Sequence, residues 1–227
     1  MSRPSIVLAN SPAVGPSALL PLAEALRRRG DRVDLPAAPA AIDHQVAAVA
    51  SCIGSGSVLV AYSAAGPRAY AIAAARPPAA IIFMDAALPR DQVAPDADPN
   101  FRDLLERLPL DSQGVLPPWI EWWSPDVLAE VCPDSAMRRL LASDCPELPR
   151  SVYAEPIPAP PYGGPCGYLA FGATYADDRA ESERRGWPTA TIAGARHLAP
   201  CVDPLAVAAA LDELIAELGV DRRSFAG

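Results

Sequence analysis

Lysine is absent from this chain of 227 residues, so all 19 side chains counted as Lys or Arg are arginines. Without lysine the protein cannot form a Schiff base with a carbonyl substrate. The formal net charge of −8 at pH 7 argues against nucleic acid or an anionic membrane as the main partner.

Long hydrophobic runs are missing as well. No stretch approaches the roughly 18 consecutive apolar residues that mark a membrane span. The apolar run at residues 6–9 is too short for a secretory signal peptide. These features predict a cytoplasmic protein without a membrane partner, and we expect a monomer or a homodimer.

Metal and cofactor signatures are also lacking. The cysteines are scattered without the paired spacing of metal ligands, which predicts reduced and mostly buried thiols: Cys52, Cys132, Cys145, Cys166 and Cys201. No phosphate-cradling loop or dinucleotide fingerprint occurs. We therefore expect an enzyme with no metal and no cofactor.

Short apolar runs alternate with helical patterns along most of the chain. The strand-like runs are 5–9, 32–35, 58–60, 80–85, 167–171 and 189–192. The helical patterns are 17–29, 41–53, 69–75, 177–185 and 204–218. This alternation predicts right-handed βαβ units and an α/β fold with a mainly parallel six-stranded sheet flanked by helices.

The pattern changes between residues 89 and 165. Prolines crowd this stretch, short helical pieces occur at 101–108, 124–131 and 134–142, and strand-like runs are missing. We predict a helical, proline-rich cap at 89–161 inserted into a core formed by 1–88 and 162–227. A cap there would cover the carboxyl end of the sheet, where open α/β sheets bind ligands.

Small residues surround Ser63, between an apolar strand and an alanine-rich helix. A sharp strand-to-helix turn needs small neighbours, because larger side chains two positions away would collide with the crossing backbone. Ala61 and Ala65 occupy those positions, and Gly66 follows. Such a turn projects the hydroxyl of Ser63 at a helix N-terminus, where backbone N–H groups face developing negative charge.

Ala-x-Ser-x-Ala at this turn resembles the Gly-x-Ser-x-Gly nucleophile elbow of the α/β-hydrolase family. The resemblance covers nearly the whole chain, from the family's third strand onward, and implies that Ser63 is a nucleophile. Of the two histidines, His197 follows the last strand-like run and resembles the family's catalytic histidine in its place. His44, in a helical stretch, is expected to be a solvated surface residue.

The acid that orients the histidine has two candidates. The family's usual position after the penultimate strand falls on Tyr175, which does not ionise at neutral pH. Asp177 and Asp178 follow it and could cap the next helix. Asp85, at the end of the strand after the elbow helix, resembles the acid of the haloalkane dehalogenase subgroup. A carboxylate at a buried strand end needs a partner, so we predict Asp85, with Asp177 as the alternative.

The family's oxyanion hole combines the N–H after the nucleophile, here Ala64, with one from the loop after the first strand. In this chain Ser11 stands in that loop and is followed by Pro12, which has no N–H. We expect Ala13 or Val14 to donate instead, or the Ser11 hydroxyl to contact the substrate in their place.

Three tryptophans in the predicted cap, Trp119, Trp122 and Trp123, would face one way on a helix. They either pack the cap onto the core or line an apolar pocket, for which Tyr62 and Tyr175 are further candidates. The predicted substrate is a hydrophobic, neutral small molecule.

Together these features predict cleavage of an ester, thioester or lactone, with Ser63 as nucleophile, His197 as base and Asp85 as the orienting acid. The altered oxyanion loop leaves open a lyase or cyclase that moves protons for elimination, dehydration or cyclisation in small-molecule biosynthesis. A binding protein that keeps the same fold without catalysis is the remaining alternative.

Overall fold

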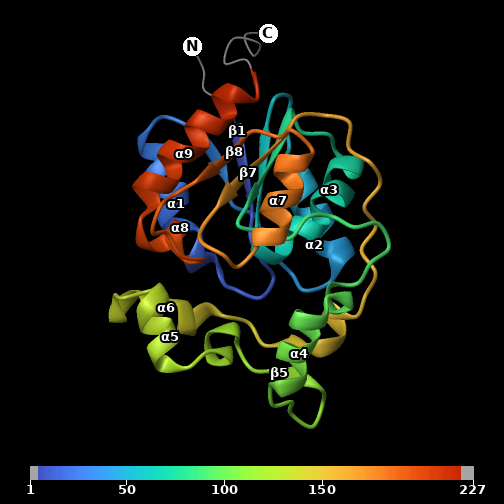
Figure 1. Ribbon diagram of the computed structural model, residues 1–227, viewed down its shortest axis with the longest axis vertical. Helices are drawn as coiled ribbons and strands as arrows, with labels where there is room; N and C mark the ends of the chain where they lie inside the picture. Colours follow the sequence, from blue (N-terminus) through green and yellow to red (C-terminus); the bar gives the residue numbers. More distant parts are fainter. Residues whose placement is uncertain (1–4, 221–227) are drawn as a thin grey trace.

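A six-stranded sheet lies at the centre of the computed structural model, which describes residues 5–220 (Figure 1). Its strand order is β2-β1-β3-β4-β7-β8, and every pairing within it is parallel. The strands are β1 (Ser5–Ala9), β2 (Arg32–Asp34), β3 (Val58–Tyr62), β4 (Ala80–Met84), β7 (Cys166–Ala170) and β8 (Thr189–Thr191). The predicted α/β architecture is confirmed.

Helices cover both faces of the sheet. On one face α1 (Leu20–Arg28) and α9 (Pro204–Glu217) share a buried cluster with Ile6 and Leu8 of β1. On the other face α2 (Ile42–Cys52) and α3 (Ala69–Ala75) bury residues against Val7 and Ala9 of the same strand. Figure 1 shows α7 (Ala176–Arg184) beside α3 on this second face.

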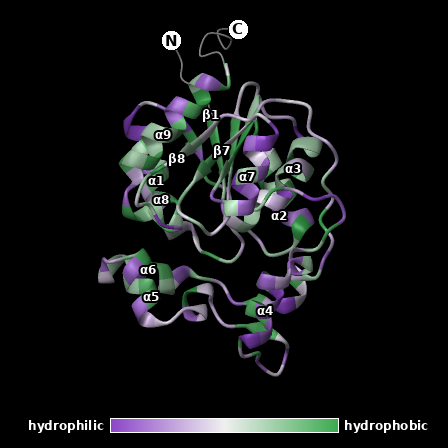
Figure 2. Cartoon of the chain, viewed as in Figure 1, coloured by the Kyte–Doolittle hydropathy of each residue, from purple (hydrophilic) through white to green (hydrophobic). Residues whose placement is uncertain are grey.

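The central strands are apolar throughout because both their faces are covered. All residues of β3, β4 and β7 are buried, as expected for parallel strands between two helical layers. Figure 2 shows these green, apolar strands inside the molecule and purple, polar positions on the surrounding helices. In residues 5–220, no helix is long and apolar enough to cross a bilayer.

Residues 85–165 connect β4 to β7 and carry α4 (Pro99–Arg107), α5 (Pro125–Val131) and α6 (Ser135–Asp144). Figure 1 shows these helices beyond the carboxyl ends of the strands. Each helix is preceded by a capping residue whose side chain accepts a backbone N–H of the first turn: Asp98, Ser124 and Asp134 respectively. These capping hydrogen bonds explain where each of the three helices begins.

Strand-like structure does occur in this connection, contrary to the sequence prediction. β5 (Val115–Leu116) pairs antiparallel with β6 (Leu148–Pro149). Strands of two residues are too short to produce an alternating pattern in the sequence. The remaining short elements are η1 (Pro16–Ala18), η2 (Ser63–Arg68), η3 (Pro95–Ala97), η4 (Trp119–Trp122), η5 (Arg150–Tyr153) and α8 (Ala199–Val202).

Candidate active site

Ser63 comes directly after β3 and opens the 3-10 helix η2. Its backbone φ is 55°, a left-handed conformation that is uncommon outside glycine. The turn is tight because η2 crosses close to the chain after β4: a Cβ on Gly66 would lie 2.1 Å from the carbonyl oxygen of Ala87. The small residues predicted around Ser63 thus allow this close packing, and Ser63 itself is 8% exposed.

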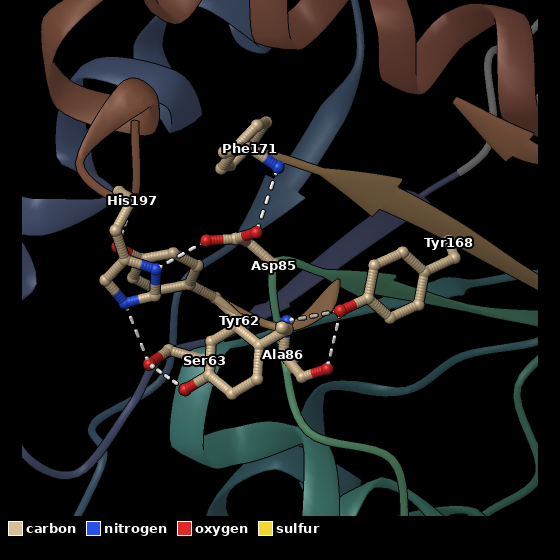
Figure 3. Close-up of polar contacts among 8 residues, drawn as sticks. Tyr62, Ser63, Asp85, Ala86, Tyr168, Phe171 and His197 are labelled. Carbon is tan, nitrogen blue, oxygen red and sulfur yellow. Dashed lines mark hydrogen bonds and ion pairs between the residues drawn. The ribbon is translucent and has the colours of Figure 1, made fainter. Parts of the chain in front are cut away.

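His197 lies between β8 and α8, and its imidazole is within hydrogen-bond distance of two predicted catalytic residues. Nε2 is 3.0 Å from Ser63 Oγ, and Nδ1 is 2.7 Å from Asp85 Oδ2. Figure 3 shows the imidazole between the hydroxyl and the carboxylate. Folding therefore brings together three side chains that lie far apart in the sequence.

Asp85 follows β4 directly, with a backbone φ of 42°, and is 1% exposed. Its second oxygen, Oδ1, accepts a hydrogen bond from the backbone N–H of Phe171 at 2.9 Å (Figure 3). A buried carboxylate is costly unless it is hydrogen-bonded, and here both oxygens have partners. Asp85 is thus held in one orientation toward the imidazole.

The alternative acid, Asp177, is exposed on α7, and the hydrogen bond of the His197 imidazole goes to Asp85 instead. The neighbouring Asp178 accepts a hydrogen bond from the N–H of Leu88 at 2.9 Å. Burial raises the pKa of the Asp178 carboxyl above its usual value. Of the carboxylates weighed from the sequence, Asp85 is the one in contact with the imidazole.

Two tyrosines adjoin the imidazole. The Tyr62 ring stacks on His197 with centroids 5.1 Å apart, and its hydroxyl donates to the His197 carbonyl oxygen at 2.7 Å. Tyr175 occupies the position where the α/β-hydrolase family usually has its acid. Its hydroxyl is 3.4 Å from Ser63 Oγ. Burial raises the pKa of Tyr175 to about 12, so its hydroxyl keeps its proton at neutral pH.

The three tryptophans do not face one way as predicted. η4 is a 3-10 helix that ends at Trp122, and Trp123 is already extended. Trp119 lies 6.2 Å from the imidazole of His197 and 5.9 Å from Trp123 between ring centroids. Trp122 instead packs on Tyr153 and donates its indole N–H to the carbonyl oxygen of Pro117. Trp119 is the one whose ring contact reaches the imidazole.

The loop after β1 runs beside the Ser63 turn. Ala9, the last residue of β1, pairs with Ala61, so the loop begins at the same end of the sheet as the strand end that carries Ser63. The N–H of Ala13 donates to Ser11 Oγ at 3.2 Å, and the N–H of Val14 donates to the Ser11 carbonyl oxygen at 3.3 Å.

Both backbone donors expected from this loop are therefore engaged within their own turn. The Ser11 hydroxyl accepts a hydrogen bond there and keeps its own proton to donate. Ala64, the other expected donor, lies in the first turn of η2, where backbone N–H groups lack helical partners.

A buried polar network, not singled out from the sequence, supports this loop. Arg68 donates to Gln45 Oε1 and, at 3.1 Å, to the Ala40 carbonyl oxygen. Gln45 Nε2 donates to the Asn10 carbonyl oxygen at 2.7 Å, and Asn10 Nδ2 donates to the Val14 carbonyl oxygen at 3.0 Å. In the sequence, the one sign of this network is Arg68 itself, a charged residue at the end of a turn made of small residues.

Comparison with known proteins finds no matching protein-family model and no matching curated protein. Solved structures do match over nearly their full length. A pyrethroid hydrolase variant superposes with a TM-score of 0.69 at 17% identity, covering 95% of this chain and 98% of that one. Tomato methylketone synthase I, in a variant complexed with β-ketoheptanoate, gives a TM-score of 0.73 at 10% identity, with 96% and 100% covered.

An extracellular α/β-hydrolase from a Paenibacillus species gives a TM-score of 0.70 at 15% identity, with 96% of this chain and 100% of that one covered. It is described as sharing structural and functional homology with tobacco Salicylic Acid Binding Protein 2. Likenesses at such low identity establish the fold alone. The chain has the α/β-hydrolase fold, which hydrolases and a methylketone synthase share.

Proposed function

We propose that this protein is a cofactor-free enzyme that cleaves an ester, thioester or lactone bond in a hydrophobic small molecule. The observation that supports this most directly is the line of contacts from Ser63 Oγ through the His197 imidazole to Asp85, at 3.0 Å and 2.7 Å. An activated serine needs a base within this distance and a third group that orients the base.

In the proposed reaction, His197 Nε2 takes the proton from Ser63 Oγ as the oxygen attacks the substrate carbonyl. Asp85 holds Nδ1–H and stabilises the imidazolium that forms. The tetrahedral intermediate expels the alcohol or thiol, which receives the proton from His197. Water then attacks the acyl-enzyme by the same route, which releases the acid and restores Ser63.

The developing oxyanion needs hydrogen-bond donors. We assign one to the backbone N–H of Ala64 and the other to the hydroxyl of Ser11, which retains its proton while it accepts from Ala13. We assign the role of the acid to Asp85, which directly follows β4. This position is similar to that of the acid in the haloalkane dehalogenase subgroup.

Aromatic rings support a hydrophobic substrate. Tyr62, Trp119 and Tyr175 all lie within ring-contact distance of the imidazole. Among the structures that share the fold, one hydrolyses pyrethroids by its description, and another is a methylketone synthase crystallised with a β-keto acid. Both substrate classes combine a carbonyl group with apolar carbon.

Proton transfer without acylation is the second candidate. It is favoured by the contact of Tyr175 Oη with Ser63 Oγ at 3.4 Å, together with the engaged N–H groups of Ala13 and Val14. Under this alternative His197 moves a proton for elimination, dehydration or cyclisation, and Ser63 only positions the substrate.

Labelling with a fluorophosphonate probe separates the two candidates. We expect the wild type and the control Ser151→Ala, which changes an exposed serine, to be labelled at equal rates. Ser63→Ala should lose labelling, and His197→Ala should slow it by at least about a thousandfold. A folded wild type that is not labelled would contradict acylation. Turnover lost in His197→Ala but kept in Ser63→Ala would then favour proton transfer, and no turnover at all would favour a binding protein.

A further inference from the structure

Arg68 is a buried cation that has no paired anion among residues 5–220. It is 2% exposed, and within the described chain it donates hydrogen bonds to the neutral oxygens of Gln45 and Ala40. Its Nε has no partner in the described part of the chain. Burial lowers the pKa of Arg68 to about 10, so the guanidinium remains charged at neutral pH.

Tyr153 also has a buried polar atom without a partner. It is 3% exposed, and its hydroxyl has no hydrogen-bond partner among residues 5–220. Its ring packs on Phe101 and Trp122, with centroids 5.2 Å and 6.1 Å away. Tyr153 belongs to a buried cluster against which Ala40 packs, and Ala40 is the residue whose carbonyl oxygen accepts from Arg68.

Both groups lie near the serine. Ser63 and Arg68 are the first and last residues of η2. Trp119 packs against the cluster that holds Tyr153, and its ring centroid lies 6.2 Å from the imidazole of His197. Glu155, two residues after Tyr153, lies on the exposed surface, and no hydrogen bond joins it to Arg68 in the described chain.

Both unsatisfied groups are donors. A buried charge and a buried hydroxyl each cost free energy when they lack a partner. One anionic acceptor would satisfy both, because a carboxylate has two oxygens and accepts strongly from guanidinium and hydroxyl groups. A group that only donates, such as an ammonium, would leave the Nε–H of Arg68 without an acceptor.

We propose that Arg68 and Tyr153 bind an acidic group of the substrate, a carboxylate, beside Ser63. The inference deepens the proposed function, since it names the class of molecule that Ser63 acts on: an apolar carbonyl compound with a carboxylate at its other end. It also replaces the neutral substrate expected from the sequence, which gave no sign that Arg68 is buried.

Binding is tested without catalysis by titrating 4-phenylbutyrate and its uncharged analogue 4-phenylbutanamide into Ser63→Ala protein by calorimetry. We expect the carboxylate to bind at least about tenfold more tightly than the amide, as hydrogen bonds to charged groups imply. Adding Tyr153→Phe or Arg68→Gln should remove most of that preference while the affinity for the amide changes less than about twofold.

Matched controls are Tyr162→Phe, whose hydroxyl bonds to the Pro78 carbonyl oxygen, and Arg27→Gln, whose guanidinium bonds to the Val33 carbonyl oxygen. Both should keep the preference. If Arg68→Gln does not fold, Tyr153→Phe decides alone. Equal binding of acid and amide, or a preference that survives Tyr153→Phe, would overturn the proposal.

A kinetic pair keeps this inference separate from the proposed reaction. The substrates are mono-4-nitrophenyl glutarate, which carries a carboxylate, and its neutral methyl ester. We expect the wild type to favour the charged substrate in kcat/KM by at least about tenfold, and Tyr153→Phe to abolish the difference. Turnover of both substrates without preference overturns the carboxylate site alone. A binding preference without turnover of either ester leaves the site standing and overturns the proposed hydrolysis.

Discussion

The Tyr62 hydroxyl donates to the carbonyl oxygen of His197 at 2.7 Å, while the Tyr62 ring stacks on the imidazole of the same residue. Tyr62 is also the residue before Ser63. The end of β3 therefore bears both the serine and the group that holds the histidine loop. Movement of the loop relative to the serine is opposed by a hydrogen bond and a ring contact at once.

Tyr62→Phe should lower kcat for 4-nitrophenyl esters by about tenfold and leave KM nearly unchanged. The hydrogen bond contributes about 1 kcal/mol to loop position, while the ring contact remains. Steady-state kinetics and urea unfolding measure the two effects, and Tyr162→Phe serves as the control. A variant with raised KM and unchanged kcat would show that Tyr62 acts on substrate binding instead.

Asp85→Asn should reduce kcat for ester hydrolysis by about 10⁴-fold, because an amide in this place favours the wrong imidazole tautomer. Asp177→Asn, which alters an exposed carboxylate on α7, should change kcat less than about twofold. Circular dichroism checks that both variants fold. If Asp177→Asn is the damaging change and Asp85→Asn is silent, the assignment of the acid is wrong.

Ser11→Ala should lower kcat by about a hundredfold, since the loss of one oxyanion donor costs about 10²–10³. Ser11→Thr keeps the hydroxyl and should recover most of the activity. The variant pair is needed because Ser11 Oγ also accepts from the N–H of Ala13. Equal loss in both variants would point to a disturbed loop rather than a missing donor.

Alkaline pH should destabilise the fold through two buried thiols. Burial raises the pKa of Cys166 and Cys201 from 9.0 to about 12. Between pH 9 and 12 the unfolded chain releases thiol protons that the folded chain keeps, so rising pH favours unfolding. The stability contributed by these neutral thiols is complete below pH 9 and is lost toward pH 12, by about 1.4 kcal/mol per pH unit for each thiol.

Urea unfolding at pH 8, 9.5 and 11 measures this effect. Cys201→Ala should show a smaller decrease in the free energy of unfolding than the wild type. Cys52→Ala, which changes a partly exposed cysteine, should match the wild type. Parallel decreases in wild type and Cys201→Ala would exclude the Cys201 thiol as a source.

The sheet was predictable because its central strands are apolar on both faces and separated by amphipathic helices. The surroundings of Ser63 were equally informative, since only small residues permit the close approach of Gly66 to Ala87. His197 was prominent because the chain has two histidines, and the structure brings it to Ser63 and Asp85.

Other features depend on contacts that no local pattern encodes. The direction of Trp122 follows from a 3-10 helix that ends one residue before Trp123. The engagement of the Ala13 N–H depends on a turn closed by the side chain of Ser11. Arg68 is buried because Gln45, 23 positions away, provides an acceptor inside the protein, and the sequence alone does not disclose that pairing.

Ser63 and Asp85 share one further property: both have positive φ, at 55° and 42°. Such backbone angles cost an L-residue roughly 1–2 kcal/mol, and here they aim the hydroxyl and the carboxylate at one ring. Glycine at either position would relax the chain and abolish the contact with His197. This strain lowers the stability of the fold, so we expect Ser63→Gly to unfold at a higher temperature than the wild type.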